Sequence, residues 1–275
     1  MNSEDFRKHA HELVDWMADY FENVEDYPVL PDIQPGDIFK QLPTEAPTSA
    51  ESFDDIFKDF KDIIMPGITH WESPNFMAYF PANKSKASVL AEMLMSTLGS
   101  QCMIWLTSPA AAELEESVMN WVRDMLGLPK TFTGVIQDTA STATLCAILT
   151  ARERATQFSV NEKGFEQQKF TVYASAEIHS SIEKAVKIAG IGAAQFRPIR
   201  VDENFAMLAD QLEKTIEQDI SQGFIPLCVV SAIGTTSTTA IDPIAAVSKI
   251  CLKHKIWHHV DAAYSGTALV LPEMR

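Results

Sequence analysis

The sequence predicts an α/β protein in which a mostly parallel sheet follows an N-terminal helical segment. Two observations lead to this fold class. Between residues 86 and 275, short apolar runs alternate with amphipathic stretches of ten or more residues, which is the pattern of βαβ units. Residues 1–85 instead combine helical periodicity with proline-rich connections. Hydrophobic residues make up 46% of the 275, enough for a sizeable core.

The N-terminal segment is expected to contain two helices. Apolar residues recur at steps of three and four from Phe6 to Phe21, and a helical period returns from Ser52 to Ile64 after two proline-rich breaks. The stretch "MPGITHWESPNFMAYFPANKS" is too rich in proline and aromatic residues for a regular element. It either plugs the seam between two lobes or forms an aromatic wall for an apolar ligand.

The remaining residues are expected to form a parallel sheet covered on both faces by helices. The helices are predicted over residues 110–126, 141–154, 180–189, 207–218 and 243–253. The strands are predicted in "TGVIQ", "KFTVYAS", "AQFRPIR", "IPLCVVSAI" and "KIWHHV". The cysteines lie far apart without CxxC spacing, so we expect buried free thiols at Cys102, Cys146, Cys228 and Cys251.

Charge and motif content exclude several classes of function. The net charge of −15 and the absence of a Lys/Arg cluster argue against a nucleic-acid partner. No segment resembles a signal peptide or is apolar over the thickness of a bilayer, so we expect a cytoplasmic protein without a membrane partner. No GxGxxG or GxxxxGK[ST] loop supports a Rossmann dinucleotide site or a P-loop.

Polar residues follow four of the predicted strands, at the edge where ligands of parallel sheets collect. "DTASTATL" opens a helix with hydroxyl side chains, which could bind a phosphate or only cap the helix. His179 precedes two serines and could cap a helix, belong to the core, stack on a ligand or move protons. "GTTSTTAID" permits close backbone approach and offers hydroxyl donors.

The fourth position is Asp261, a carboxylate at the end of an apolar strand, which needs a cation or a hydrogen-bond network. A metal is poorly supported, because His258 and His259 point to opposite faces and no second carboxylate lies nearby. A structural Arg or Lys and the protonated ring nitrogen of pyridoxal phosphate (PLP) remain. PLP accounts for all four positions together, since it has a phosphate, a flat ring and a cationic nitrogen.

These segments, in order and together with "IMPGITHWESPNFMAYFP", resemble the group II PLP-dependent decarboxylases, most closely the aromatic-L-amino-acid (DOPA/tryptophan/tyrosine) decarboxylases. The resemblance implies a fold-type I, aminotransferase-like PLP-binding domain over residues 86–275, incomplete at its C-terminal end. Residues 1–85 would form a helical dimerisation segment and an aromatic substrate loop within a homodimer. The implied activity is that of a lyase that converts an aromatic L-amino acid to the arylalkylamine and CO2.

The resemblance also implies roles for particular residues. Six residues would bind the cofactor. Ala140 and Ser141 would bind the phosphate, His179 and Ala263 would contact the ring, Thr236 would contact the cofactor face, and Asp261 would pair with the ring nitrogen. His179 and Asp261 would also be the catalytic residues. The substrate pocket would be lined by Trp71, Tyr79, Phe80, Pro81 and Ala82. This sequence departs from many animal members at Asp138, where they have Gly, and at Ala82, where they have Thr. No metal site is implied.

The family's Schiff-base lysine is expected beyond the portion in this chain, in an N-P-H-K motif that follows the strand-end aspartate. We therefore expect a companion C-terminal polypeptide that carries this lysine, as in a nicked subunit. Three alternatives remain: a histidine decarboxylase, an aromatic aldehyde synthase of the same family, and a non-catalytic scaffold fragment. In the aldehyde-forming branch of the family, the position that corresponds to His179 resembles Asn rather than His. His179 therefore favours simple decarboxylation.

Overall fold

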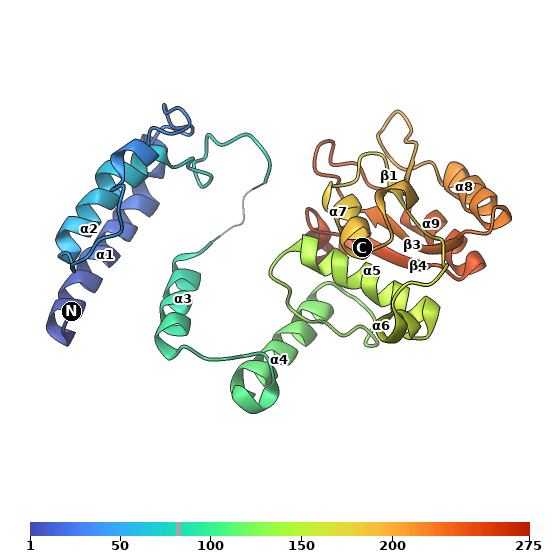
Figure 1. Cartoon of the computed structure of the whole chain (residues 1–275), viewed down its shortest axis with the longest axis horizontal. Coiled ribbons are helices and arrows are strands. Elements are labelled where there is room, and N and C mark those ends of the chain that lie inside the picture. Colours follow the sequence, from blue (N-terminus) through green and yellow to red (C-terminus); the bar gives the residue numbers. More distant parts are fainter. Residues whose placement is uncertain (81–83) are drawn as a thin grey trace. The chain divides into compact units, whose positions relative to one another are not determined.

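The computed structural model describes residues 1–80 and 84–275, which form two compact units, Met1–Leu90 and Ala91–Arg275 (Figure 1). The helices are α1 (Ser3–Asn23), α2 (Phe53–Asp59), α3 (Lys86–Leu98), α4 (Pro109–Met125), α5 (Ala140–Thr156), α6 (Ser159–Lys163), α7 (Ser181–Ile188), α8 (Ala209–Ser221) and α9 (Ile244–His254). The strands are β1 (Phe170–Ser175), β2 (Phe196–Ile199), β3 (Ile225–Ala232) and β4 (Trp257–Asp261). Within residues 1–80 and 84–275, no helix combines the length and apolar character needed to cross a membrane.

The first unit is built on α1 and α2. A capping box starts α1, because the Asn2 side chain accepts the backbone N–H groups of Glu4 and Asp5. The Trp16 ring of α1 meets the edges of Phe57 and Phe60 at centroid distances of 6.0 and 5.3 Å. The single helix predicted over residues 52–64 is wrong in detail. Instead, α2 ends at Asp59 and continues as a π-helical turn over Phe60–Ile64.

The second unit contains a four-stranded, entirely parallel sheet with the strand order β2-β1-β3-β4. This confirms the α/β class and the parallel sheet expected from the alternating pattern. The strand predicted over residues 133–137 is absent, so that prediction was wrong. The Ile136 N–H donates instead to the Glu115 carboxylate of α4 at 2.7 Å, and no strand within the described residues pairs with this segment.

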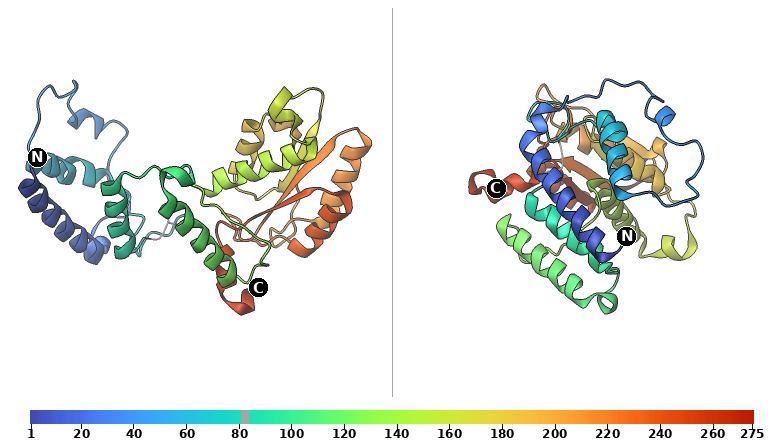
Figure 2. Two further views of the ribbon diagram at one scale, coloured as in Figure 1. Left: turned by 90° about the horizontal axis from the view of Figure 1, so that it is seen from below. Right: turned by 90° about the vertical axis from the view of Figure 1, so that its left-hand side faces the viewer.

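Helices cover both faces of the sheet, as the two views in Figure 2 show. Because strand side chains alternate, Val172 and Val230 face α5 and α7, whereas Tyr173 and Val229 face α8 and α9. Each face buries its own apolar cluster; Ile148 and Ile182 are fully buried on the first face, as are Leu212, Ile216 and Val247 on the second. The result is a three-layer α/β/α unit whose strand ends are free to carry polar residues.

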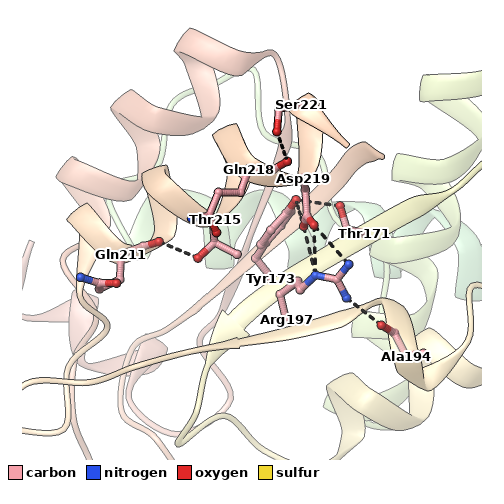
Figure 3. A network of polar contacts seen from close by, with 9 residues as sticks. All are labelled: Thr171, Tyr173, Ala194, Arg197, Gln211, Thr215, Gln218, Asp219 and Ser221. Carbon is pink, nitrogen blue, oxygen red and sulfur yellow. Dashed lines mark hydrogen bonds and ion pairs between the residues drawn. The ribbon is translucent and has the colours of Figure 1, made fainter. Parts of the chain in front are cut away.

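A buried polar network joins α8 to the sheet (Figure 3). The Asp219 carboxylate of α8 accepts two hydrogen bonds from the Arg197 guanidinium at 3.1 and 3.2 Å, and one from the Tyr173 hydroxyl at 2.8 Å. The Thr171 hydroxyl lies 2.7 Å from the Tyr173 hydroxyl. Asp219 is only 5% exposed. Burial raises the pKa of Tyr173, so the phenol remains protonated and acts as a donor to Asp219.

The four cysteines differ from the buried free thiols that the sequence predicts. All four thiols are free, but only Cys228 and Cys251 are buried. The expected burial of Cys102 and Cys146 is wrong; Cys146 lies on an exposed side of α5.

The Arg275 side chain donates Nη2–H to the Met125 carbonyl at 2.8 Å and so satisfies the C-terminal end of α4.

Candidate active site

The carboxyl ends of β1, β3 and β4 lie at one edge of the sheet, because the three strands are parallel and adjacent. Ala232 of β3 is directly opposite Asp261 of β4. His179 and Thr236 lie in the segments that follow β1 and β3, and Asp261 is the last residue of β4. These three predicted cofactor contacts therefore come from the ends of strands that are neighbours in the sheet, and Figure 1 labels those strands as β1, β3 and β4.

Asp261 is half-buried and only partly satisfied by the protein. Its Oδ1 accepts the N–H of Ala263 at 3.1 Å, and its backbone carbonyl accepts the N–H of Ile233 at 2.9 Å. Within the part of the chain that the structure describes, no lysine or arginine forms an ion pair with Asp261. The alternative of a structural basic partner is therefore not supported, and the carboxylate is available to an external cation.

Two histidines of β4 fix the side of the sheet on which Asp261 lies. His259 Nε2 lies 3.2 Å from the Thr144 hydroxyl of α5, and His258 Nε2 lies 2.8 Å from the Ser231 hydroxyl of β3. Residues two apart in a strand share a face, so Asp261 projects to the same side as His259 and α5. Neither histidine belongs to a group of possible metal ligands among the described residues.

The start of α5 offers free backbone donors on that side. The Thr139 side chain caps the helix by accepting the N–H of Thr142 at 3.2 Å. The N–H groups of Ala140 and Ser141 find no partner among the described residues, and both residues are exposed. The Thr139 side chain thus caps the helix but satisfies only one of its first N–H groups. The N–H groups of Ala140 and Ser141 remain available to bind an anion.

His179 lies at the start of α7 and is exposed. Its Nδ1 accepts the N–H of Ser181 at 3.3 Å and lies 2.8 Å from the Ser181 hydroxyl. Ser180 makes no capping bond, so the capping role considered for the serines belongs to the histidine. Because Nδ1 is an acceptor, the proton of the neutral ring is on Nε2. The predicted stacking of this ring on a cofactor remains a prediction.

The loop after β3 is held by residues that the sequence analysis did not single out. Thr235 is buried and its hydroxyl accepts the N–H of Ala240 at 3.1 Å, whereas the hydroxyl of the half-buried Thr236 has no hydrogen bond within the described residues. The buried Asp242 carboxylate accepts the N–H groups of Met207 and Ala232, both at 2.8 Å. Burial raises the pKa of Asp242. Its position just before α9 was the only sequence signal for this role.

The predicted aromatic loop lies in the first unit. Trp71 stacks on Phe76 and Tyr79, with ring centroids 4.7 and 5.7 Å apart. Trp71 and Tyr79 remain 43% and 77% exposed, and Phe80 is 40% exposed. Pro81 and Ala82 lie outside the described residues. The loop therefore presents a preformed stack of apolar rings, which is what an aromatic wall requires.

Gly234, the first residue of the loop after Ile233, is predicted to tolerate no side chain. Its φ is +83°, and an added Cβ would lie 2.6 Å from a Tyr264 ring carbon. Gly234→Ala should lower the free energy of unfolding by about 1–3 kcal/mol in urea titrations. Gly223→Ala is the matched control, because Gly223 has a φ of +81° but no atom within 4 Å of an added Cβ. Equal losses in the two variants would contradict the steric argument.

The two β4 histidines predict a pH dependence of stability. Burial lowers the pKa of both His258 and His259 below the ordinary value of about 6.5; proximity of the rings lowers that of His258 further, and Asp261 partly offsets the effect at His259. The unfolded chain therefore binds more protons than the folded protein just below this value. The free energy of unfolding should be highest above about pH 6.5 and should fall as the pH drops toward 5. Urea titrations between pH 5 and 8 measure this, and His259→Gln should flatten the dependence.

The fold and the site define a class of protein: an α/β protein with an anion position at a helix start and an unpaired carboxylate at the neighbouring strand end. The model of a protein family described as "Pyridoxal-dependent decarboxylase conserved domain" matches residues 35–275. The chain belongs to this family, and the family confirms the recognition made from the sequence motifs. The cofactor expected from the sequence is the one in the family's name.

Several plant proteins are similar over the full length of this chain. A phenylacetaldehyde synthase of Arabidopsis thaliana is 43% identical over 100% of the chain and 57% of its own length. An aromatic-L-amino-acid decarboxylase of Catharanthus roseus is 44% identical, and 56% of it is covered. The crystal structure of Catharanthus roseus tryptophan decarboxylase with L-tryptophan matches with a TM-score of 0.93 at 44% identity, covering 99% of this chain and 58% of that one. The chain thus spans a little over half of these relatives.

Proposed function

We propose that this chain is the N-terminal, PLP-binding part of a carboxy-lyase that decarboxylates an aromatic L-amino acid to the arylalkylamine and CO2. The observation that carries the proposal is Asp261, a strand-end carboxylate without a lysine or arginine partner among the described residues, on the same side of the sheet as the free N–H groups of α5. Relatives named as tryptophan, tyrosine and aromatic-L-amino-acid decarboxylases, 41–44% identical over the whole chain, support this assignment.

The described residues fit PLP in charge and position. The N–H groups of Ala140 and Ser141 would bind its phosphate. Asp261 would hold a proton on the ring nitrogen, and the Ala263 N–H bond to Oδ1 fixes the carboxylate for that task. His179 presents its Nε2–H from the start of α7, while Nδ1 is engaged with Ser181. When bound, the cofactor supplies an electron sink for the electron pair left behind by CO2.

The substrate side chain would be recognised by the aromatic loop. The rings of Trp71 and Tyr79 are nearly parallel, at an interplanar angle of 13°, and expose apolar surface that an indole or phenol could contact. An aromatic amino acid fits such a surface better than histidine, whose imidazole is more polar. We therefore propose tryptophan, tyrosine or DOPA, and not histidine, as the class of substrate.

The direct test is incubation of the intact protein, together with PLP and a co-expressed C-terminal polypeptide, with each aromatic amino acid. Mass spectrometry should detect the corresponding amine. We expect no amine from this chain expressed without its companion, because the Schiff-base lysine is expected in the companion. Absence of amine from the assembled protein with every aromatic amino acid, despite stoichiometric bound PLP, would refute the proposal.

A second candidate function is that of an aromatic aldehyde synthase, because the Arabidopsis phenylacetaldehyde synthase is as similar as the decarboxylases. His179→Asn separates the two. If the His179 imidazole directs simple decarboxylation, the variant should lose at least about tenfold in amine production and instead consume O2 and water to release aldehyde, CO2, ammonia and hydrogen peroxide. Product analysis by mass spectrometry, with a peroxide assay, measures both. An unchanged amine yield would show that position 179 does not select the product.

We also propose that the protein acts as a homodimer. The support is a set of large apolar side chains on α3 and in the segment that leads to α4, each exposed by more than 60%: Leu94, Met95, Leu98, Met103 and Leu106. A second copy of the chain would cover such a surface. Sedimentation equilibrium of the protein assembled with its companion should give the mass of two complete subunits.

A further inference from the structure

A cluster of possible metal ligands lies on the surface formed by α8 and α9, apart from the candidate active site. Glu213 and Glu217 are one turn apart on α8, so their carboxylates lie on the same face of the helix. His254 is the last residue of α9. One ligand atom from each of the three residues lies within 4.8 Å of the others.

The two carboxylates already hold a cation, the ammonium of Lys253. Its Nζ lies 2.6 Å from Glu213 Oε1 and 3.1 Å from Glu217 Oε1. Lys253 is 55% exposed on a flexible side chain, which leaves it free to move into solvent when a stronger cation arrives.

His254 supplies an independent observation that points to a ligand. Its ring is only 12% exposed, and Nε2 is buried without a hydrogen-bond partner among the described residues. The nearest carboxylate oxygen, Glu213 Oε1, is 4.0 Å away, which is too long for a hydrogen bond. Leaving a buried nitrogen without a partner is unfavourable, and an ion is one of the partners that explains such an atom.

We propose that Glu213, Glu217 and His254 bind one divalent transition-metal cation of the zinc type. Two carboxylate oxygens and an imidazole nitrogen are ligands that Zn²⁺ accepts, with water in the fourth position. The metal would take over the carboxylates from Lys253 and give His254 Nε2 its missing partner. Because the ligands come from two helices, the bound ion would join α8 to α9 on the sheet face that they cover.

A second group with suitable atoms among the described residues, His9, Glu12 and Asp54, provides an internal comparison. There the histidine is already satisfied, because His9 Nδ1 lies 3.0 Å from Glu12 Oε2. It therefore lacks the unpartnered nitrogen that distinguishes His254. His9→Gln is the matched control variant, since it removes a histidine from a similar cluster in the other unit.

Titration calorimetry of the chelator-treated protein with ZnCl₂ tests the proposal. We expect one Zn²⁺ per chain with a dissociation constant in the micromolar range, about −8 kcal/mol. His254→Gln and Glu217→Gln should each weaken binding by about tenfold or more, whereas His9→Gln should leave it unchanged. Lys253→Met should strengthen binding, because it removes the competing ammonium.

A thermal unfolding scan with and without ZnCl₂ provides a second readout. Zinc should raise the midpoint of the parent and of His9→Gln, but not that of His254→Gln or Glu217→Gln. Glu217 is 54% exposed, so its substitution is not expected to impair folding. The proposal is overturned if the parent binds no zinc at about 100 μM, if His254→Gln binds like the parent, or if Lys253→Met weakens binding.

Discussion

Asp261→Ala is expected to abolish decarboxylation while leaving part of the PLP binding intact. The proposed role of Asp261 is to keep the ring nitrogen protonated, and without a nearby negative charge that proton is lost and the ring accepts electrons poorly. The N–H groups of Ala140 and Ser141 are untouched by the substitution, so the phosphate would remain bound. The loss of turnover should be on the order of 100-fold or more.

The experiment uses the intact protein and measures amine formation and PLP content in parallel. Asp261→Asn keeps the shape of the side chain and its hydrogen bond from Ala263 but removes the charge, so it should lose nearly as much activity as Asp261→Ala. Asp210→Asn, at an exposed position on α8, is the control for a general effect of charge. Unchanged turnover in Asp261→Asn would rule out the charge-based role.

Asp219→Ala is expected to cause the largest loss of stability. The substitution leaves the Arg197 guanidinium and the Tyr173 hydroxyl without their shared acceptor, in a site where Asp219 is 5% exposed and the Arg197 side chain 22%. Removing one partner of a buried ion pair typically costs about 3–5 kcal/mol, because the other charge stays behind unpaired. Urea unfolding followed by circular dichroism measures the change in the free energy of unfolding.

Tyr173→Phe and Arg197→Met separate the contributions within this network. Tyr173→Phe removes one hydrogen bond to Asp219 and should cost about 1–2 kcal/mol, since the ring still fills its place. The double variant Asp219→Ala, Arg197→Met removes both charges and should recover part of the loss of Asp219→Ala. If Asp219→Ala costs less than about 1 kcal/mol, the network does not hold α8 to the sheet as described.

The strands of the sheet could be predicted where their own residues determine them. Residues 170–175 and 225–232 form β1 and β3, because each apolar run is buried between helices on both faces, and residues 257–261 pair with β3 as the half-buried edge strand β4. Residues 133–137 have a similar composition but no neighbouring strand in the described residues, and their backbone donor turns to Glu115. A strand requires a partner, and no local pattern reveals whether one is present.

The candidate site could be predicted in outline for the same reason. His179 and Thr236 follow parallel strands and Asp261 ends one, and the carboxyl ends of such strands must share an edge. Which atoms are satisfied could not be predicted: Thr235 and Asp242 brace the loop through contacts 5 to 35 positions apart in the sequence. These contacts depend on which loop segments the fold brings next to one another, and the residue types of a segment do not reveal this.

The contact between Arg275 and the Met125 carbonyl joins residues 150 positions apart in the sequence. During synthesis, α4 leaves the ribosome long before Arg275 exists, so its C-terminal carbonyls are first exposed to water. Closing so long a loop carries an entropic cost, which places this contact among the last to form. Maturation of α4 is therefore expected to follow assembly of the sheet, and a nascent chain arrested before residue 275 should show α4 as more sensitive to protease than β1 or β3.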